Sequence, residues 1–167
     1  MKKLPTKQEL EKYYNYDKNT GIVTRKIRMG NMAAETFVGN HQSKGYLETS
    51  FKNKRYLLHR LCFIMGGGKI SDQEQIDHIN HRRDDNRFEN LRACNNMINN
   101  RNTTKRITNT SGRMGVWYRK DTRKWVAEIM VNYRKYILGS YETFEDAVLS
   151  RQDAEVKYGF HENHGVE

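Results

Sequence analysis

The sequence is poor in the residues and segments that mark secreted, membrane or disulfide-linked proteins. Its two cysteines, Cys62 and Cys94, are 32 residues apart and form no CxxC or CxxH pair, so neither a disulfide framework nor structural zinc is expected. Both are predicted to be core thiols. No apolar run approaches the roughly eighteen residues of a membrane-spanning helix, and the start MKKLPTKQEL has no signal-peptide core. We therefore expect a cytoplasmic protein without a membrane partner.

Acidic residues are in the minority, and so are hydrophobic ones. Twenty Asp and Glu stand against thirty Lys and Arg, which gives a formal charge of +10 and a pI near 9.6. Such an excess favours a polyanionic partner, nucleic acid first. Hydrophobic residues make up only 36% of the chain, although it has ten Tyr, six Phe and two Trp. This composition favours small modules with aromatic cores over one large core.

Turn residues and apolar spacing predict hairpins and then a helix in the first 70 residues. Residues 13–26 place an Asn-Thr-Gly turn between aromatic and β-branched runs, and residues 45–61 repeat the pattern around Lys52-Asn53-Lys54. The three glycines at 66–68 predict the end of the helix, because GGGKIS lacks the spacing of a phosphate-binding P-loop. The helix itself is predicted from apolar residues at helical spacing, namely Leu57, Leu58, Leu61, Cys62 and Met65.

A second module is predicted after a polar linker at 103–110. The segments MGVWYRK, KWVAEIMV and KYILGSY predict three strands joined by tight turns, and Thr143 with Asp146 predicts the capped start of a helix. Residues 101–136 contain ten basic and two acidic residues, net +8, whereas residues 137–167 contain two basic and seven acidic residues, net −5. A basic sheet backed by an acidic helix is suited to the major groove of DNA.

The segment that carries chemistry is QIDHINHRRDDNRFENLRACNNMINNRN, residues 75–102. Asp77 and His78 are adjacent on a short β-like run, and Asn90 and Asn99 follow 13 and 22 residues after Asp77. Hydrolysis of a phosphodiester needs a water, a base and a cation. A His can be the base, while an Asp and an amide oxygen are suitable ligands for Mg²⁺. On residue chemistry alone, a purely structural Asp-His pair remains the alternative.

The order Asp-His, Asn-Leu-Arg, Asn-Asn-Arg-Asn resembles the HNH endonuclease family in its phage and intron-encoded branch, where Asn replaces the final His. The resemblance extends upstream through Gly45-Tyr46-Leu47 and residues 56–61, and it covers about residues 12–102. It implies a ββα-metal fold that holds one divalent cation, Mg²⁺ or in its place Mn²⁺. Cleavage in this family leaves a 5′-phosphate and a 3′-hydroxyl.

The resemblance also implies roles for individual residues. Asp77 and Asn99 would bind the metal, His78 would be the general base, and Asn90 would fix the loop and the orientation of His78. Basic residues around this site are expected to position DNA phosphates: Arg82, Arg83, Arg87, Arg92 and Arg101.

Two further histidines lie near the predicted site. His81 stands where relatives commonly carry Gly, and it is either a surface side chain or a phosphate contact. His59 is interpreted as a helix residue satisfied by a local hydrogen bond, although relatives carry a His there near the active site.

Residues 111–160 resemble an AP2-type DNA-binding domain, in Gly115-Val116, residues 125–129, Leu138-Gly139 and the helix start at 144–147. In that family the sheet enters the major groove, and Trp125 could alternatively be a core residue. The matching positions for DNA contact are Arg113, Trp117, Arg119, Lys124, Trp125, Lys135 and Tyr136.

Together these patterns predict an α+β protein with N-terminal hairpins at 1–58, a ββα-metal nuclease core at 59–102 and an AP2-like domain at 111–160. The predicted function is a site-specific, metal-dependent homing endonuclease of a phage or mobile element. It would act on double-stranded DNA as a monomer, in the cytoplasm of a bacterial or phage-infected cell. A DNA-binding regulator that does not cut is the first alternative, and an RNA-binding protein is disfavoured because no RRM or KH signature is present.

Overall fold

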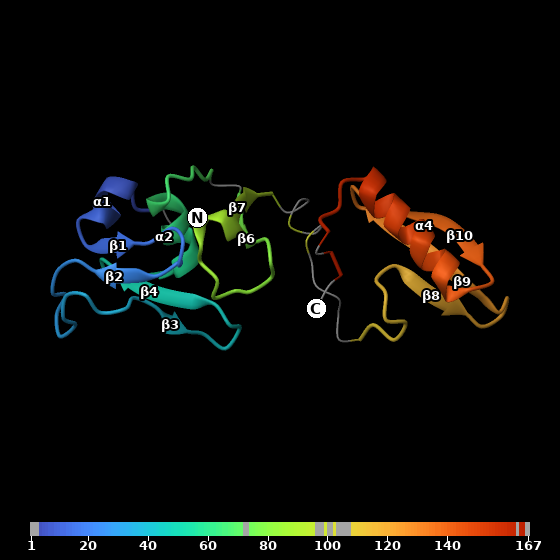
Figure 1. Ribbon diagram of the computed structural model, residues 1–167, viewed down its shortest axis with the longest axis horizontal. Helices are drawn as coiled ribbons and strands as arrows, with labels where there is room; N and C mark the ends of the chain where they lie inside the picture. Colours follow the sequence, from blue (N-terminus) through green and yellow to red (C-terminus); the bar gives the residue numbers. More distant parts are fainter. Residues whose placement is uncertain are drawn as a thin grey trace. The chain divides into compact units, whose positions relative to one another are not determined.

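The computed structural model describes residues 4–71, 74–95, 99, 102, 108–162 and 164–165. The chain divides into two compact units, Met1–Asn96 and Met97–Glu167, which run from blue to yellow-green and from there to red in Figure 1. The mixture of helices and strands agrees with the predicted α+β class. Within the described ranges, no helix is long and apolar enough to cross a membrane.

Two antiparallel sheets open the first unit and confirm the predicted hairpins. The first pairs β1 (Tyr14–Tyr16) with β2 (Val23–Arg25), and the second has the order β3 (Asn40–His41), β4 (Leu47–Phe51), β5 (Lys54–Leu57). The turn between β4 and β5 has positive φ at Lys52 and Asn53, as a tight two-residue hairpin turn requires. A short helix that the sequence patterns did not predict, α1 (Lys7–Glu11), starts with a capping box between Thr6 and Glu9.

The predicted helix is present as α2 (Leu58–Met65) and ends at Gly66. A Cβ at Gly66 would lie 2.1 Å from the ring of Phe88, so only glycine allows this close approach. Cys62 is a buried free thiol in α2, as predicted. The helix contacts β4 and β5 and also both strands of the later hairpin β6–β7. The N-terminal sheets and that hairpin therefore share one hydrophobic core.

The hairpin that carries the predicted chemistry pairs β6 (Gln75–His78) with β7 (Leu91–Cys94). The loop between them, residues 79–90, ends in a 3-10 turn, η1 (Phe88–Asn90). In this register Asp77 lies opposite Arg92, and His78 lies opposite Leu91. Cys94, at the end of β7, is the second buried free thiol.

The second unit is a three-stranded antiparallel sheet with one helix on its face (Figure 1). Its strands are β8 (Val116–Arg119), β9 (Lys124–Val131) and β10 (Arg134–Tyr141), in the order β10, β9, β8, and its helix is α4 (Phe144–Lys157). The side-chain oxygen of Thr143 accepts a hydrogen bond from the Asp146 backbone at 3.2 Å, which confirms the predicted helix cap. Most of the predicted linker, residues 103–107, lies outside the described residues.

Candidate active site

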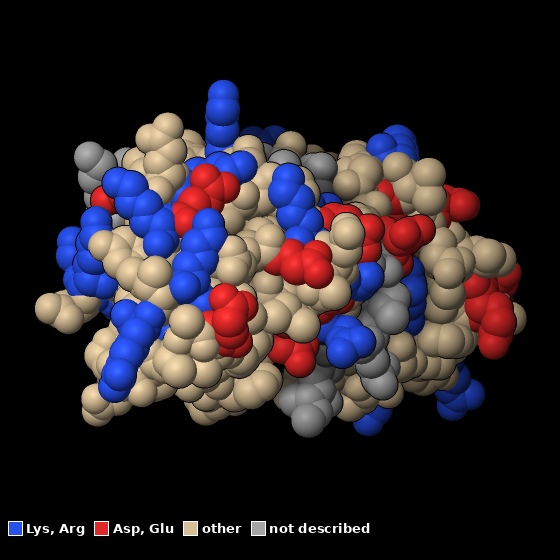
Figure 2. Space-filling view, turned by 60° about the vertical axis from the view of Figure 1, so that its left-hand side comes forward, with Lys and Arg blue, Asp and Glu red and all other residues tan. Residues whose placement is uncertain are grey.

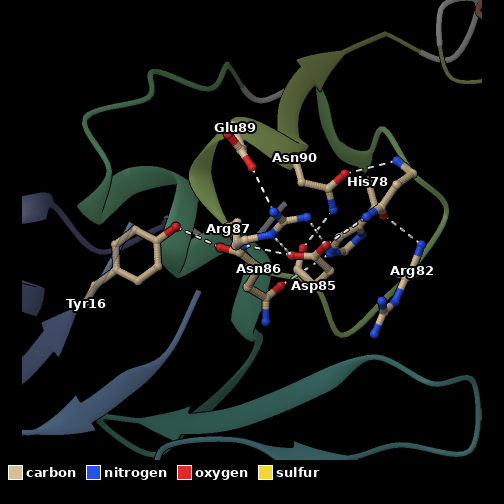
Figure 3. A network of polar contacts seen from close by, with 9 residues as sticks. Tyr16, His78, Arg82, Asp85, Asn86, Arg87, Glu89 and Asn90 are labelled. Carbon is tan, nitrogen blue, oxygen red and sulfur yellow. Dashed lines mark hydrogen bonds and ion pairs between the residues drawn. The ribbon is translucent and has the colours of Figure 1, made fainter. Parts of the chain in front are cut away.

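Asn90 joins the two ends of the loop that follows His78 (Figure 3). Its side-chain oxygen accepts a hydrogen bond from the Asn80 backbone at 3.0 Å, and its amide nitrogen donates to the Asp85 carbonyl at 2.8 Å. The Ile79 backbone also donates to the Asn90 carbonyl, at 2.9 Å. One asparagine thus closes loop 79–90 on itself, which is the geometry that the predicted loop-fixing role requires.

A second set of contacts inside the loop centres on the Asp85 carboxylate. It accepts hydrogen bonds from Arg87 Nε at 2.9 Å, from Arg87 Nη2 at 2.8 Å and from Asn80 Nδ2 at 2.7 Å. The hydrogen bonds from Arg87 lower the pKa of Asp85 to about 2. Because this carboxylate is ionised and fully engaged, it stiffens the loop next to the predicted catalytic residues.

Asp77 is the acidic residue of the site, and it pairs with Arg92 across the hairpin. Arg92 Nη2 and Nε lie 2.8 and 3.1 Å from Asp77 Oδ2, and the Asp77 side chain is only 11% exposed. No group of three or more His, Cys, Asp or Glu that could hold a metal occurs in the described part of the chain. Mg²⁺ needs fewer, because it takes one or two protein oxygens and completes its shell with water and phosphate. Asp77 fits that requirement.

The second predicted metal ligand, Asn99, lies in the second unit. Its pairing with Asp77 therefore stays a prediction.

His78 lies at the end of β6 in a buried, partly aromatic environment. Its side chain is 4% exposed, the His59 ring lies edge-on with centroids 4.9 Å apart, and the Tyr46 ring lies at 5.9 Å. Burial lowers the pKa of His78 below its ordinary value, which favours the neutral form of the ring. A neutral imidazole has a lone pair with which it can accept a proton.

His59 differs from the expected helix residue with a local hydrogen bond. It is 4% exposed, and its Nδ1 has no hydrogen-bond partner among the described residues. The reason is that α2 turns this side chain into the core, against the rings of Tyr46 and His78. Burial, with a smaller contribution from His78, lowers the pKa of His59 to about 3.

The low pKa of His59 should make the protein less stable in acid. The unfolded chain takes up a proton on this residue below about pH 6.5, whereas the folded chain does so only near pH 3. The free energy of unfolding should therefore decrease as the pH is lowered through this window. This decrease should be steeper in the wild type than in His59→Gln, by up to about 1.4 kcal/mol per pH unit. Urea unfolding followed by circular dichroism from pH 7 to pH 4 would measure both slopes. Parallel slopes would contradict this assignment.

The basic residues predicted around the site are largely engaged within the first unit. Arg83 stacks on Tyr46 at 5.0 Å and donates to the Lys44 carbonyl, and Arg87 and Arg92 pair with the carboxylates already described. Arg82 is exposed on the loop, and Arg101 lies outside the described residues. Figure 2 shows Lys and Arg spread over the visible face with groups of Asp and Glu between them. The positive charge on this face is therefore not confined to one patch.

In the second unit, four of the described side chains share the face of the sheet that does not pack on α4. Trp117 Nε1 and Lys135 Nζ both donate to the Glu128 carboxylate, at 3.1 and 3.2 Å. The Arg119 guanidinium lies over the Trp117 ring at 5.1 Å. On the opposite face, Val116 and Ala127 pack against Ala147 of α4. The sheet thus has an apolar inner face and a polar, aromatic outer face.

The other predicted DNA-contact residues have intramolecular partners. Arg113 pairs with Glu155, Lys124 pairs with Glu142 at 2.8 Å, and Tyr136 stacks on Tyr158. Trp125 packs on Phe144 with centroids 4.8 Å apart and joins the core cluster, which fits the alternative considered for it. Arg119 and Lys135 both lie on the outer face of the sheet, Lys135 as a partner of the Glu128 carboxylate.

Three loop residues near His78 were not singled out from the sequence: Asn80, Asp85 and Asn86. Their contacts depend on side chains that meet only after the loop has closed. A cue was present in the polar density of the segment DDNRFEN, but polar residues are common in any loop.

Comparisons with known proteins bear on this hairpin. Residues 56–101 match the family model for the HNH endonuclease. The match includes the end of β5, helix α2, and the β6–β7 hairpin with its loop. Among solved structures, the chain is similar to one described as "DNA binding and cleavage by the HNH homing endonuclease I-HmuI", at 22% sequence identity and a TM-score of 0.41. The similarity covers 57% of this chain and 53% of that chain, so the present chain spans about half the length of that protein. No curated protein matches. Residues 56–101, which include the β6–β7 hairpin and its loop, are therefore similar to the HNH endonuclease family.

Proposed function

We propose that the protein is a site-specific, metal-dependent DNA endonuclease of the homing type that phages and other mobile elements carry. The observation that supports this most directly is the β6–β7 hairpin, which holds a buried His78 next to Asp77. The loop that follows is closed by its own side chains. Such rigidity is what a general base needs, because proton transfer depends on its position relative to the water.

In the proposed mechanism His78 accepts a proton from a water molecule as its oxygen attacks the phosphorus. The phosphorus–O3′ bond breaks, and the leaving O3′ takes up a proton from solvent water, which leaves a 5′-phosphate and a 3′-hydroxyl. Asp77 and Asn99 would hold a divalent cation, Mg²⁺ or Mn²⁺, which when bound supplies charge neutralisation at the phosphate and the leaving oxygen. Asn90 keeps the loop closed so that the His78 ring stays in place.

The second unit is proposed to supply most of the affinity for double-stranded DNA, in the manner of an AP2-type sheet. Its outer face combines Arg119 and Lys135 with the exposed ring of Trp117. A two- or three-stranded sheet can enter the major groove, where cations bind phosphates and planar side chains contact bases. Cutting would then be the task of the first unit and recognition that of the second.

The experiment that tests the proposed function is cleavage of supercoiled plasmid DNA by the purified protein with and without Mg²⁺. We expect nicked or linear product only when Mg²⁺ is present. Binding to the plasmid without cleavage under any metal condition would favour a non-cutting regulator. Preference for single-stranded RNA over duplex DNA would instead indicate an RNA-binding protein.

A substitution in the second unit should separate binding from cutting. Arg119→Ala removes one cation from the outer face, so the affinity for DNA should fall. The slope of log K against log salt should become shallower by about one, the amount expected for one lost phosphate contact. Cleavage of DNA that is already bound should be unchanged, because Arg119 lies in the other unit from His78. Lys157→Ala, on α4, is the matched control and should alter neither. Equal losses in both variants would contradict the assignment of the sheet face.

A further inference from the structure

Asn86 is a buried polar residue of the nuclease loop to which the mechanism above assigns no task. It is 1% exposed and lies between the Asp84–Asp85 turn and η1. Its side-chain nitrogen has no hydrogen-bond partner among the described residues. An amide kept only for the stability of the loop would normally have hydrogen-bond partners for both its nitrogen and its oxygen.

That oxygen faces the predicted base. Asn86 Oδ1 lies 3.3 Å from His78 Nε2. A carbonyl oxygen can only accept, so this contact is a hydrogen bond when Nε2 carries the ring proton. A neutral imidazole has one protonated nitrogen, and the partner of that nitrogen selects the tautomer. Asn86 thereby leaves the lone pair on Nδ1.

The β1–β2 hairpin, which is distant from Asn86 in the sequence, contacts Asn86 and holds it in place (Figure 3). The Tyr16 hydroxyl donates to the Asn86 carbonyl at 2.7 Å, and the Phe88 backbone donates to the Lys18 carbonyl at 3.0 Å. Gly21 has φ +76°, and a Cβ there would lie 2.6 Å from Arg87 N and 2.7 Å from the Asn86 carbonyl carbon. The β1–β2 turn is therefore pressed against the backbone of residues 86–88 without room for a side chain.

We propose that Asn86 is a positioning residue of the nuclease: its side-chain oxygen fixes the His78 ring through Nε2, and the β1–β2 hairpin fixes Asn86. This inference rests on the proposed function, in which His78 is the general base. It gives the N-terminal hairpin a part in catalysis that no motif in residues 1–58 indicates. Asn86 acts through His78 and touches neither DNA nor the reacting atoms.

Substitutions at Asn86 test the positioning role through the rate at which the protein cleaves DNA that is already bound. Asn86→Leu keeps the approximate size and removes the acceptor, so single-turnover cleavage of plasmid DNA should fall by about 10- to 100-fold, with unchanged DNA affinity. Asn86→Asp keeps an oxygen acceptor and should recover most of the rate. Tyr16→Phe should give a smaller loss. Asn15→Leu, the same change at an exposed position of β1, is the matched control and should cut normally.

A spectroscopic measurement tests the same inference without a substrate that must be cut, and its main result comes from the wild-type protein. Long-range proton–nitrogen NMR of the wild-type protein without DNA, assigned against His78→Ala, should show the His78 proton on Nε2. Asn86→Leu should shift it toward a mixture of tautomers. A proton on Nδ1 in the wild type would overturn the proposal, as would equal rate losses in Asn86→Leu and Asn86→Asp. If the wild type fails to cut DNA while the tautomer still responds to Asn86, the positioning role stands and the proposed function falls.

Discussion

Replacing His78 by Ala should slow single-turnover DNA cleavage by about 10² to 10⁴-fold, the usual contribution of a general base. Affinity for DNA, measured in Ca²⁺, should stay close to that of the wild type, because a buried neutral imidazole adds little attraction for phosphates. A loss confined to the chemical step is the signature of an interaction made in the transition state. The loss should persist at every Mg²⁺ concentration.

Other roles for His78 give different outcomes in the same experiment. If the ring bound the metal, raising the Mg²⁺ concentration would restore the rate of the His78→Ala variant. If His81 were the base, His81→Ala would be inactive and His78→Ala would cut normally. His81 lies on the loop beyond the end of β6, with φ +64°, and so serves as the matched histidine control. Wild-type cutting by His78→Ala would overturn the mechanism.

Replacing Asp77 by Ala should abolish cleavage at ordinary Mg²⁺ concentrations and leave most of the binding. The variant should behave like the wild type in EDTA, because the variant lacks the proposed charged metal ligand and the EDTA-treated wild type lacks the metal ion. DNA binding should remain in both, because Lys and Arg contacts to phosphate need no metal. Asp84→Ala, which removes an exposed carboxylate from the same loop, is the control and should cut normally. A plasmid cleavage series over Mg²⁺ concentration compares all three proteins.

The Asp77 substitution also releases Arg92, so its effect on folding must be measured beside its effect on cutting. Arg92 is 26% exposed and loses its partner across the hairpin; such a pair contributes little when it is solvated, and somewhat more when it is partly buried. Asp77→Asn keeps the shape and an oxygen, and it should retain the fold while losing most of the activity. A fully active Asp77→Ala protein would remove Asp77 from the site.

Sequence patterns predicted the local elements well because their signals are local. The Asn-Thr-Gly turn, the apolar spacing of α2 and the Thr143 cap each act within a few residues, and each element appears where it was expected. Helix α1 was missed because five residues are too few for an apolar period to show. The Asp77-His78 pair was found because its spacing to later Asn residues resembles a family pattern.

The contacts of the site could not be predicted in the same way, because they join residues distant in sequence. Tyr16 and Asn86 are 70 residues apart, and nothing in either neighbourhood indicates the other. Arg87 and Arg92 were expected to contact phosphates, yet both pair with carboxylates. The number of charged residues indicates the sign of the electrostatic potential around a site. It does not identify the partner of each charge, because that depends on strand register and loop closure.

The most direct test of the central claim, that the protein cuts DNA by attack of water on phosphorus with O3′ as the leaving group, is cleavage in water enriched in heavy oxygen. Mass spectrometry of the products should show the label in the 5′-phosphate and none at the 3′ ends, which carry hydroxyls. Label in a 3′-phosphate, or cleavage without incorporation of the label, would contradict the account.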